Sequence, residues 1–182
     1  MKRRMQVRSM AYIALFAVLT AVCAWISIPT LVPFTLQTFG VFLALGLLGG
    51  KRGTLAVLVY LLIGAAGVPV YAQFTGGLGV LFGVTGGYLI GFLASGLAYW
   101  LITRFAGRGP VASGVAMAVG LAVCYAFGTA WFMVVYAKNF GPIGLGAALA
   151  SCVFPFVLPD LAKIALALFL TVRLRPHLRL EA

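Results

Sequence analysis

The sequence has very little charge, and almost none of it is negative. Among its 182 residues there are 13 Lys and Arg but only 2 Asp and Glu. A soluble domain covers its surface with charged residues, which make up about a quarter of its composition, so a globular cytoplasmic enzyme is disfavoured. Hydrophobic residues instead make up 64% of the chain, enough for several membrane crossings of about 20 residues each. The composition predicts an all-α integral membrane protein in which residues 1–182 form a single domain.

Motifs for catalysis, nucleotide binding and metal binding are missing as well. The sequence contains no G-x-x-x-x-G-K-[ST], G-x-G-x-x-G, H-E-x-x-H or C-x-x-C pattern. Its 3 cysteines lie far apart in apolar runs, where they predict buried packing residues rather than disulfides or ligands. General acid–base catalysis usually needs two tuned groups, and the apolar segments offer few candidates. We therefore expect no enzyme activity, no metal site and no cofactor.

Apolar runs bounded by charges, prolines or polar clusters predict a bundle of six transmembrane helices. The region after Gly141 is too long for one crossing and is interrupted by prolines. Because proline is tolerated in the first helical turn, Pro159 is expected to open the last helix, and residues 143–157 are expected to form an interfacial segment on the outer side. The predicted spans are 10–28, 37–50, 53–68, 85–106, 111–136 and 159–173.

The distribution of basic residues predicts the orientation of these helices. With the N-terminus in the cytoplasm, every basic residue except Lys138 and Lys163 falls on the inner side, as the positive-inside rule requires. Only an even number of crossings gives this result, so both termini are expected to be cytoplasmic. The net charge of +11 then needs no nucleic acid, which is bound by basic residues on one polar face. We expect a multi-pass protein of the inner (plasma) membrane, in contact with lipid.

Two charged residues lie inside an apolar segment. Asp160 and Lys163 are three residues apart and therefore share one face of a helix. A charge in the hydrocarbon region costs several kcal/mol and by default marks a functional site. One explanation is an internal ion pair that only neutralises itself. The other is a site that offers both an acceptor and a donor to a polar ligand inside an apolar pocket.

Two uncharged outer loops carry side chains suited to such a ligand. The loop between the first two spans contains Phe34, Thr35 and Gln37, which predict a lid over a cavity, with an ordinary turn as the alternative. The segment before the fourth span is rich in glycine and ends at Tyr88. Glycines let the backbone approach a ligand closely, and tyrosine covers an apolar ring while its hydroxyl binds a polar edge.

Small residues at helical spacing predict close contacts between helices, because in lipid they allow backbones to approach. Such stripes run through residues 83–95 and 112–128, and through the first span. Internal packing is one explanation for each stripe. For the first span the alternative is a smooth face that docks a partner membrane protein, formed by Ala14, Ala17, Ala21 and Ala24.

Five motifs occur in order along the chain: VPFTLQT at 32–38, GGKRG at 49–53, YLLIGAAGVPV at 60–70, GVTGGY at 83–88 and PDLAK at 159–163. Taken together, they give the chain a family resemblance. The sequence resembles the BioY family, the biotin-binding membrane subunits, or S components, of energy-coupling factor (ECF) transporters. One departure is Val84, where the family usually has proline before Thr-Gly-Gly-Tyr.

The resemblance implies a six-helix fold that holds biotin near the outer face under the loop between the first two helices. It implies a site lined by Asp160, Lys163 and Tyr88, with the backbone of Thr85, Gly86 and Gly87 and the lid residues Thr35 and Gln37 nearby. It further implies a transmembrane coupling subunit and two cytosolic ATPase subunits as partners. The alanine face of the first span matches the small-residue surface that S components use to dock the coupling subunit.

The sequence thus predicts high-affinity capture of biotin for ATP-driven import. Which polar group of biotin contacts Asp160 and which contacts Lys163 stays open. The alternative is a stand-alone proton- or ion-coupled transporter that uses Asp160 as the proton carrier. Secondary transporters often contain inverted repeats with paired broken helices, whereas only the last segment of this chain is expected to be broken.

Overall fold

The computed structural model describes residues 2–178, with side chains from Gln6 onward. Several basic residues used in the orientation prediction lie outside the described side chains, namely Lys2, Arg3, Arg4 and Arg179. The described chain is all-α apart from one short β pair. Strands β1 (Ser27–Ile28) and β2 (Phe34–Thr35) are antiparallel, with Ser27 opposite Thr35 and Ile28 opposite Phe34.

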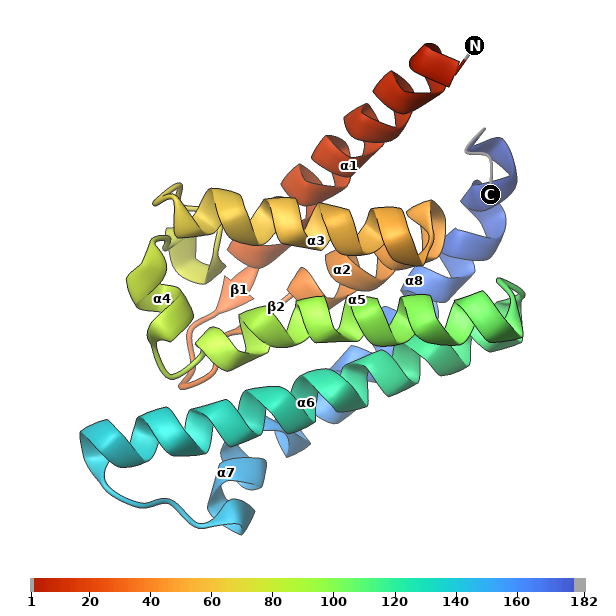
Figure 1. The fold of residues 1–182 in the computed structure, drawn as a ribbon. Helices are drawn as coiled ribbons and strands as arrows, with labels where there is room; N and C mark the ends of the chain where they lie inside the picture. The colour runs from red at the N-terminus through yellow and green to blue at the C-terminus, as the bar shows by residue number, and fades with distance from the viewer. Residues whose placement is uncertain (1, 179–182) are drawn as a thin grey trace.

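Long helices form a bundle, and short helices cover one of its ends (Figure 1). The short elements are η1 (Ala72–Phe74), α4 (Leu78–Phe82), α7 (Leu145–Cys152) and, at the other end, η2 (Arg175–His177). The long helices are α1 (Lys2–Trp25), α2 (Gln37–Leu48), α3 (Gly50–Ala65), α5 (Gly86–Ala106), α6 (Pro110–Phe140) and α8 (Phe154–Leu174).

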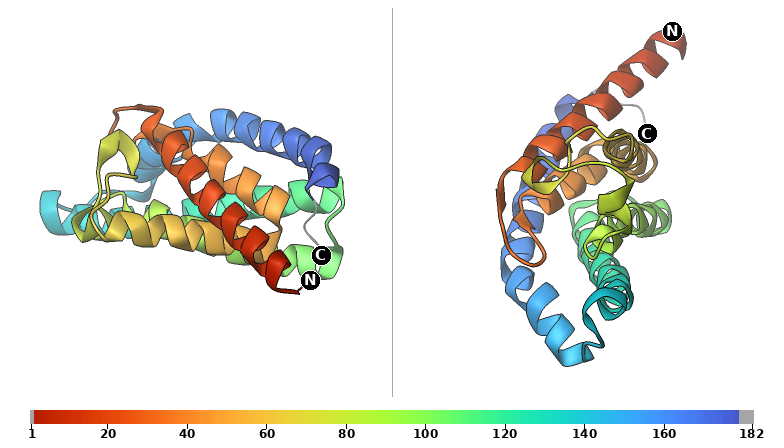
Figure 2. Two further views of the ribbon diagram at one scale, coloured as in Figure 1. Left: turned by 90° about the horizontal axis from the view of Figure 1, so that it is seen from above. Right: turned by 90° about the vertical axis from the view of Figure 1, so that its left-hand side faces the viewer.

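The two ends of the bundle differ in what they contain. One end holds the start of α1, the α2–α3 and α5–α6 connections and the end of α8, while the β pair, η1, α4 and α7 lie at the other (Figures 1 and 2). We call the first the basic end, because it carries Arg8, Arg52, Arg108 and Arg175, and the second the hairpin end. Charge is therefore segregated along the long axis of the bundle.

The helices vary in how well their length matches a membrane. The segments Gln6–Trp25, Gly86–Ala106, Pro110–Phe140 and Phe154–His177 are each long and apolar enough to cross one. The 12 residues of α2 and the 16 of α3 rise only about 18 and 24 Å, at about 1.5 Å per residue. In α2 every residue except Phe39 is buried, since α1, α3 and α8 all pack against it. The fold is that of an all-α membrane protein with one short helix in its interior.

The region around the last prolines differs from the sequence prediction. Helix α8 begins at Phe154 rather than at Pro159, and it carries Pro159 inside it. The first-turn position tolerant of proline is occupied by Pro155 instead. Pro159 removes only the one N–H that would reach the Pro155 carbonyl, and neighbouring helices make such a loss tolerable in a membrane helix. Residues 143–157 are accordingly divided between α7 and the first turn of α8.

The stripes of small residues pack helices inside the bundle. An added Cβ at Gly128 of α6 would collide with the ring of Tyr88 on α5, and one at Gly87 of α5 would collide with Trp131 on α6. Gly91 likewise faces Cys124, because an added Cβ there would lie only 3.1 Å from the sulfur. These contacts explain why α5 and α6 lie closely side by side along their length.

The alanine face of α1 is not the exposed docking surface that the sequence predicts. Ala17, Ala21 and Ala24 are only 2%, 4% and 0% exposed, because α1 packs against α2 and α3 of the same chain. Gly40 of α2 makes this approach possible, since an added Cβ would lie 3.1 Å from the Thr20 Cα. Of the four alanines, Ala14 alone is exposed. A docking face for a partner on this helix has to consist mainly of other residues.

Candidate ligand-binding site

A cavity of about 380 Å³ opens near the hairpin end of the bundle. Its volume lies within the range of about 300–1,000 Å³ that is typical of small-molecule sites. Polar side chains on its wall come from the β pair, α2, α5, α6 and α8, so helices distant in sequence meet there. They include Thr35, Gln37, Thr38, Thr85, Tyr88, Tyr125, Asp160 and Lys163.

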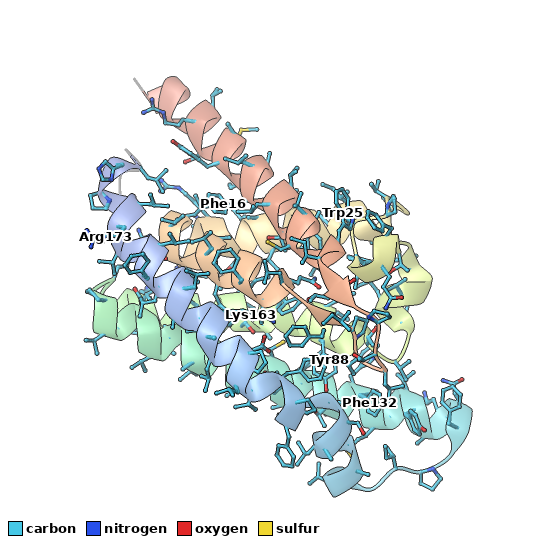
Figure 3. The ribbon with its side chains drawn as sticks, turned by 180° about the vertical axis from the view of Figure 1, so that it is seen from behind. Phe16, Trp25, Tyr88, Phe132, Lys163 and Arg173 are labelled. Atoms are coloured by element: carbon cyan, nitrogen blue, oxygen red, sulfur yellow. The ribbon has the colours of Figure 1, made fainter. Side chains whose placement is uncertain are left out.

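Asp160 and Lys163 form a buried ion pair on this wall. They lie one turn apart in α8, with 2.8 Å between Lys163 Nζ and Asp160 Oδ1. The two residues are only 4% and 8% exposed. Figure 3 shows Lys163 midway along α8, far from Arg173 at the basic end of the same helix. The pair therefore sits inside the bundle and not at either end of the helix.

Other side chains complete the contacts of the Asp160 carboxylate. The Thr38 hydroxyl donates to Oδ1 at 2.9 Å, and the Tyr125 hydroxyl donates to Oδ2 at 2.6 Å. Hydrogen bonds to a charged group are shorter and stronger than neutral ones. A buried charge without partners would cost several kcal/mol, so Thr38 and Tyr125 are part of what allows Asp160 to stay in the bundle.

Lys163 connects α8 to the loop between α1 and α2. Its Nζ donates to the Thr35 carbonyl at 2.6 Å and lies 4.3 Å from the centre of the Phe34 ring. The Phe34 ring in turn stacks on Phe156 of α8, with 5.8 Å between ring centres. The hairpin thus lies over the ion pair and is fastened to α8 by a hydrogen bond, a cation–π contact and an aromatic stack.

Much of the remaining cavity wall is aromatic and aliphatic. Tyr88 is 9% exposed, and its hydroxyl lies 3.0 Å from the Thr129 hydroxyl. Leu89, Phe92, Leu121 and Phe156 contribute further apolar surface to the wall. A mostly apolar wall that includes an ion pair suits a molecule that has a compact apolar ring system and a few polar atoms on one edge.

Not every residue that the sequence assigns to the site reaches the cavity wall. Thr35, Gln37, Thr85 and Tyr88 line it together with the ion pair, whereas Phe34, Gly86 and Gly87 are outside the lining. Phe34 is turned instead toward Lys163 and Phe156.

Gly86 and Gly87 allow the first turn of α5 to pack closely against its neighbours. An added Cβ at Gly86 would collide with the Leu81 backbone, and one at Gly87 with Trp131. They therefore permit the close packing that positions Thr85 and Tyr88, and they do not line the cavity themselves.

Tyr125 carries no signal in the sequence, and Thr38 is noticed there only as the last residue of the VPFTLQT motif. Thr38 and Tyr125 are single hydroxyls within apolar helices, and their partner Asp160 is 122 and 35 residues away. Gln37 lines the cavity, and its amide also donates to the Tyr60 hydroxyl at 2.8 Å.

Tyr71, in the loop after α3, donates to the Leu61 carbonyl at 2.7 Å. Burial raises the pKa of Tyr71 to about 12. Within the described part of the chain, no cluster of three His, Cys, Asp or Glu residues has the arrangement of a metal site.

Comparisons with known proteins show what this chain is similar to. A family model described as the BioY family matches residues 1–180. The biotin transporter BioY of Thermotoga maritima is 43% identical over 173 residues, which cover 92% of this chain and 96% of that protein. The probable biotin transporter BioY of Pyrococcus horikoshii is 38% identical over 172 residues, which cover 94% and 98%.

A solved structure has the same fold. It is a crystal structure of the S-component for biotin from an ECF-type ABC transporter, with a TM-score of 0.84. The alignment covers 97% of this chain and 95% of that chain at 23% sequence identity. At this level of identity the similarity concerns the arrangement of the helices, and the site has to be judged from the residues of this chain.

Proposed function

The chain belongs to the BioY family, and from that premise we propose that it is the biotin-binding membrane subunit, or S component, of an ECF importer. The observation that carries this proposal is the buried Asp160–Lys163 pair on the wall of a cavity of about 380 Å³. The family relatives from Thermotoga maritima and Pyrococcus horikoshii, which are named as biotin transporters, align with nearly the whole chain.

The chemistry of biotin matches the cavity wall. Its ureido ring offers two N–H donors beside a carbonyl acceptor, and its valerate chain ends in a carboxylate. The Asp160 carboxylate accepts, and the Lys163 ammonium donates. We assign the polar contacts with biotin to these two residues, with Thr35, Gln37 and Thr85 nearby and the ring of Tyr88 against the apolar part of the bicycle. Phe34, Gly86 and Gly87 act indirectly, by holding the hairpin and the start of α5 in place.

The proposal includes an arrangement in the inner (plasma) membrane. Helices α1, α2, α3, α5, α6 and α8 would make six crossings, with both termini in the cytoplasm. The gathering of basic residues at one end of the bundle supports this orientation. The burial of α2 supports the assignment of a short helix as a crossing, because a helix enclosed by its neighbours need not match the lipid thickness. The cavity would then face the outside of the cell.

Import would also require partner subunits. The chain has no nucleotide-binding loop, so ATP hydrolysis would come from two cytosolic ATPase subunits through a transmembrane coupling subunit. The alternative is a stand-alone transporter in which Asp160 carries a proton. No contact among the described residues favours it, since the Asp160 oxygens already accept hydrogen bonds from Thr38, Tyr125 and Lys163.

Equilibrium binding of biotin to the purified full-length chain in detergent tests the proposal. The wild type should bind biotin in preference to other vitamins. Asp160→Asn and Lys163→Ala should each weaken binding by about 1.5–3 kcal/mol, the value of a hydrogen bond to a charged group. Lys138→Ala is the matched control, because Lys138 is exposed at the end of α6. Unchanged affinity in both site variants would reject the assigned site, and absence of biotin binding by the wild type would reject the function.

A further inference from the structure

A second cavity, of about 400 Å³, lies at the basic end of the bundle. It is formed where the start of α6, the end of α8 and η2 meet, so it is distinct from the ligand cavity near the hairpin. Its lining combines two arginines with a mostly apolar wall. The lining residues are Leu47, Arg108, Pro110, Ser113, Leu168, Thr171, Val172, Arg175, Pro176 and Leu178.

The two arginines are held together by the fold. Arg175 Nη1 donates to the Arg108 carbonyl at 2.5 Å. Arg108 Nη2 reaches the Gly46 and Leu47 carbonyls at the end of α2, but over long distances of 3.3 and 3.4 Å. The position of this guanidinium depends on Gly49, which has a φ of +82° and at which a Cβ would lie 2.7 Å from Arg108 Cζ.

The hydrogen-bonding capacity of these arginines is not used up. The buried Nε of Arg108 has no hydrogen-bond partner among the described residues, whereas buried donors are nearly always paired. The accepting groups that the structure gives to either guanidinium are neutral backbone carbonyls. The site therefore contains an unpaired N–H donor of Arg108 and a cavity that can hold an acceptor.

The positive charge is also not balanced by a carboxylate of the described chain. The sequence has 2 acidic residues; Asp160 is paired with Lys163 in the other cavity, and Glu181 lies outside the described residues. Burial disfavours the charged form of Arg108 and lowers its pKa, and the neighbouring positive charge of Arg175 lowers it further. An anion in the cavity would offset the repulsion between the two guanidinium groups.

Two further features fit a phosphate group. Helix α6 begins at Pro110 on the cavity wall, and the start of a long helix carries partial positive charge that favours phosphate. Val172 on the wall is 47% exposed and Leu168 lies one turn before it, so the arginines border an apolar surface of α8. A lipid has this same combination of an anionic headgroup and an apolar chain.

We propose that the cavity between Arg108 and Arg175 binds a phosphate group, supplied by the phosphodiester headgroup of an anionic membrane lipid. The guanidinium groups would hold the phosphate oxygens, and the acyl chains would extend along the apolar surface of α8. Free inorganic phosphate is the other source of the same chemistry, and the experiment separates the two.

The test is native mass spectrometry of the full-length protein titrated with phosphatidylglycerol or phosphatidylcholine. The wild type should retain phosphatidylglycerol preferentially. Arg175→Gln should reduce this retention about fivefold or more, the effect of one arginine at an anionic surface. Arg104→Gln is the matched control, since Arg104 is an exposed arginine at the end of α5 that does not line the cavity. Arg108→Gln serves as a second variant, and circular dichroism and gel filtration show that each variant is folded.

The possible results distinguish a bound lipid, bound free phosphate and no phosphate site. Loss of phosphatidylglycerol in Arg175→Gln but not in Arg104→Gln supports the proposal. Calorimetric binding of inorganic phosphate that depends on Arg175, without any preference for phosphatidylglycerol, keeps the phosphate site but overturns the lipid as its source. Equal retention of both lipids together with no binding of phosphate, or equal losses in the Arg175 and Arg104 variants, overturns the proposal.

Discussion

Asp160 and Lys163 are held in an apolar bundle by contacts from three separate parts of the chain. Thr38 from α2 and Tyr125 from α6 donate to the carboxylate, while Lys163 donates to the backbone of the hairpin. The ion pair is therefore both a structural link and the polar part of the cavity wall. These two roles, which the sequence presents as alternatives, are compatible, because the paired side chains still line the cavity.

Tyr125 gives a prediction about positioning. Tyr125→Phe removes the donor to Asp160 Oδ2 and leaves the ring in place, so we expect biotin affinity to fall by about 1–3 kcal/mol as the carboxylate loses a partner. The check is equilibrium binding by isothermal titration calorimetry. Tyr136→Phe, on the same helix but outside the cavity lining, is the control. If both variants bind biotin equally well, Tyr125 does not position Asp160.

At the scale of single residues the sequence reveals charges better than hydroxyls. Asp160 and Lys163 are conspicuous because charges are costly in an apolar segment. Tyr125 is not, since a single hydroxyl in an apolar helix gives no signal until a partner is near it, and Thr38 stands out only as the last residue of the VPFTLQT motif. Phe34 was placed at the cavity by its position in the loop, but its contact with Lys163 turns it away from the lining.

The hairpin between α1 and α2 is the element that covers the ion pair. Its hold on α8 rests on the Lys163 contact with the Thr35 carbonyl and on the Phe34 ring. Phe34→Ala should loosen this cover, and we expect biotin to dissociate several-fold faster, as a stopped-flow competition experiment would measure. Ile28→Ala is the control, since Ile28 pairs with Phe34 in the hairpin but is 60% exposed. Identical dissociation rates in the two variants would contradict this role.

The packing of α5 against α6 gives a prediction about stability. Gly128→Ala places a methyl group against the Tyr88 ring, and overpacking of this kind costs about 1–3 kcal/mol. Gly146→Ala in α7 is the matched control, because nothing lies within 4 Å of the added Cβ and alanine favours the helix. Thermal unfolding in detergent should show a lower midpoint for Gly128→Ala only. If Gly128→Ala unfolds at the same midpoint as the wild type, the contact between α5 and α6 accommodates the added methyl group without loss of stability.

At the scale of elements the apolar runs predict the long helices, but local rules do not fix their ends. The sequence predicts that Pro159 starts α8, yet the helix starts five residues earlier at Phe154, because surrounding helices compensate for the lost hydrogen bond. The alanines of α1 show the same limitation. Small residues predict a close contact, but the sequence does not reveal that the partner surface is α2 and α3 of the same chain.

At the scale of the whole molecule, the segregation of charge predicts the orientation in the membrane. Gly109 at the basic end and Gly144 at the hairpin end are both exposed. With the native cysteines replaced by alanine, a membrane-impermeant maleimide applied to intact spheroplasts should label Gly144→Cys and leave Gly109→Cys unlabelled. Permeabilised cells provide the control in which both react. The reverse labelling pattern would contradict the cytoplasmic placement of the termini.

The family membership is confirmed at this scale, since the BioY model matches residues 1–180. Five ordered motifs made it predictable from the sequence, although no single motif was specific enough. The size and lining of the two cavities could not be predicted from the sequence, because each is formed by side chains from helices far apart in the chain. The arginines of the second cavity contributed to the sequence prediction only as charges that set the orientation.

The most direct measurement is the structure of the full-length protein bound to biotin. We predict biotin in the cavity between the hairpin and α8, with a polar atom of the ligand within about 3 Å of Asp160 or Lys163 and its bicycle against Tyr88. Biotin bound elsewhere on the bundle, or in the cavity without a polar contact to either residue, would contradict the central claim.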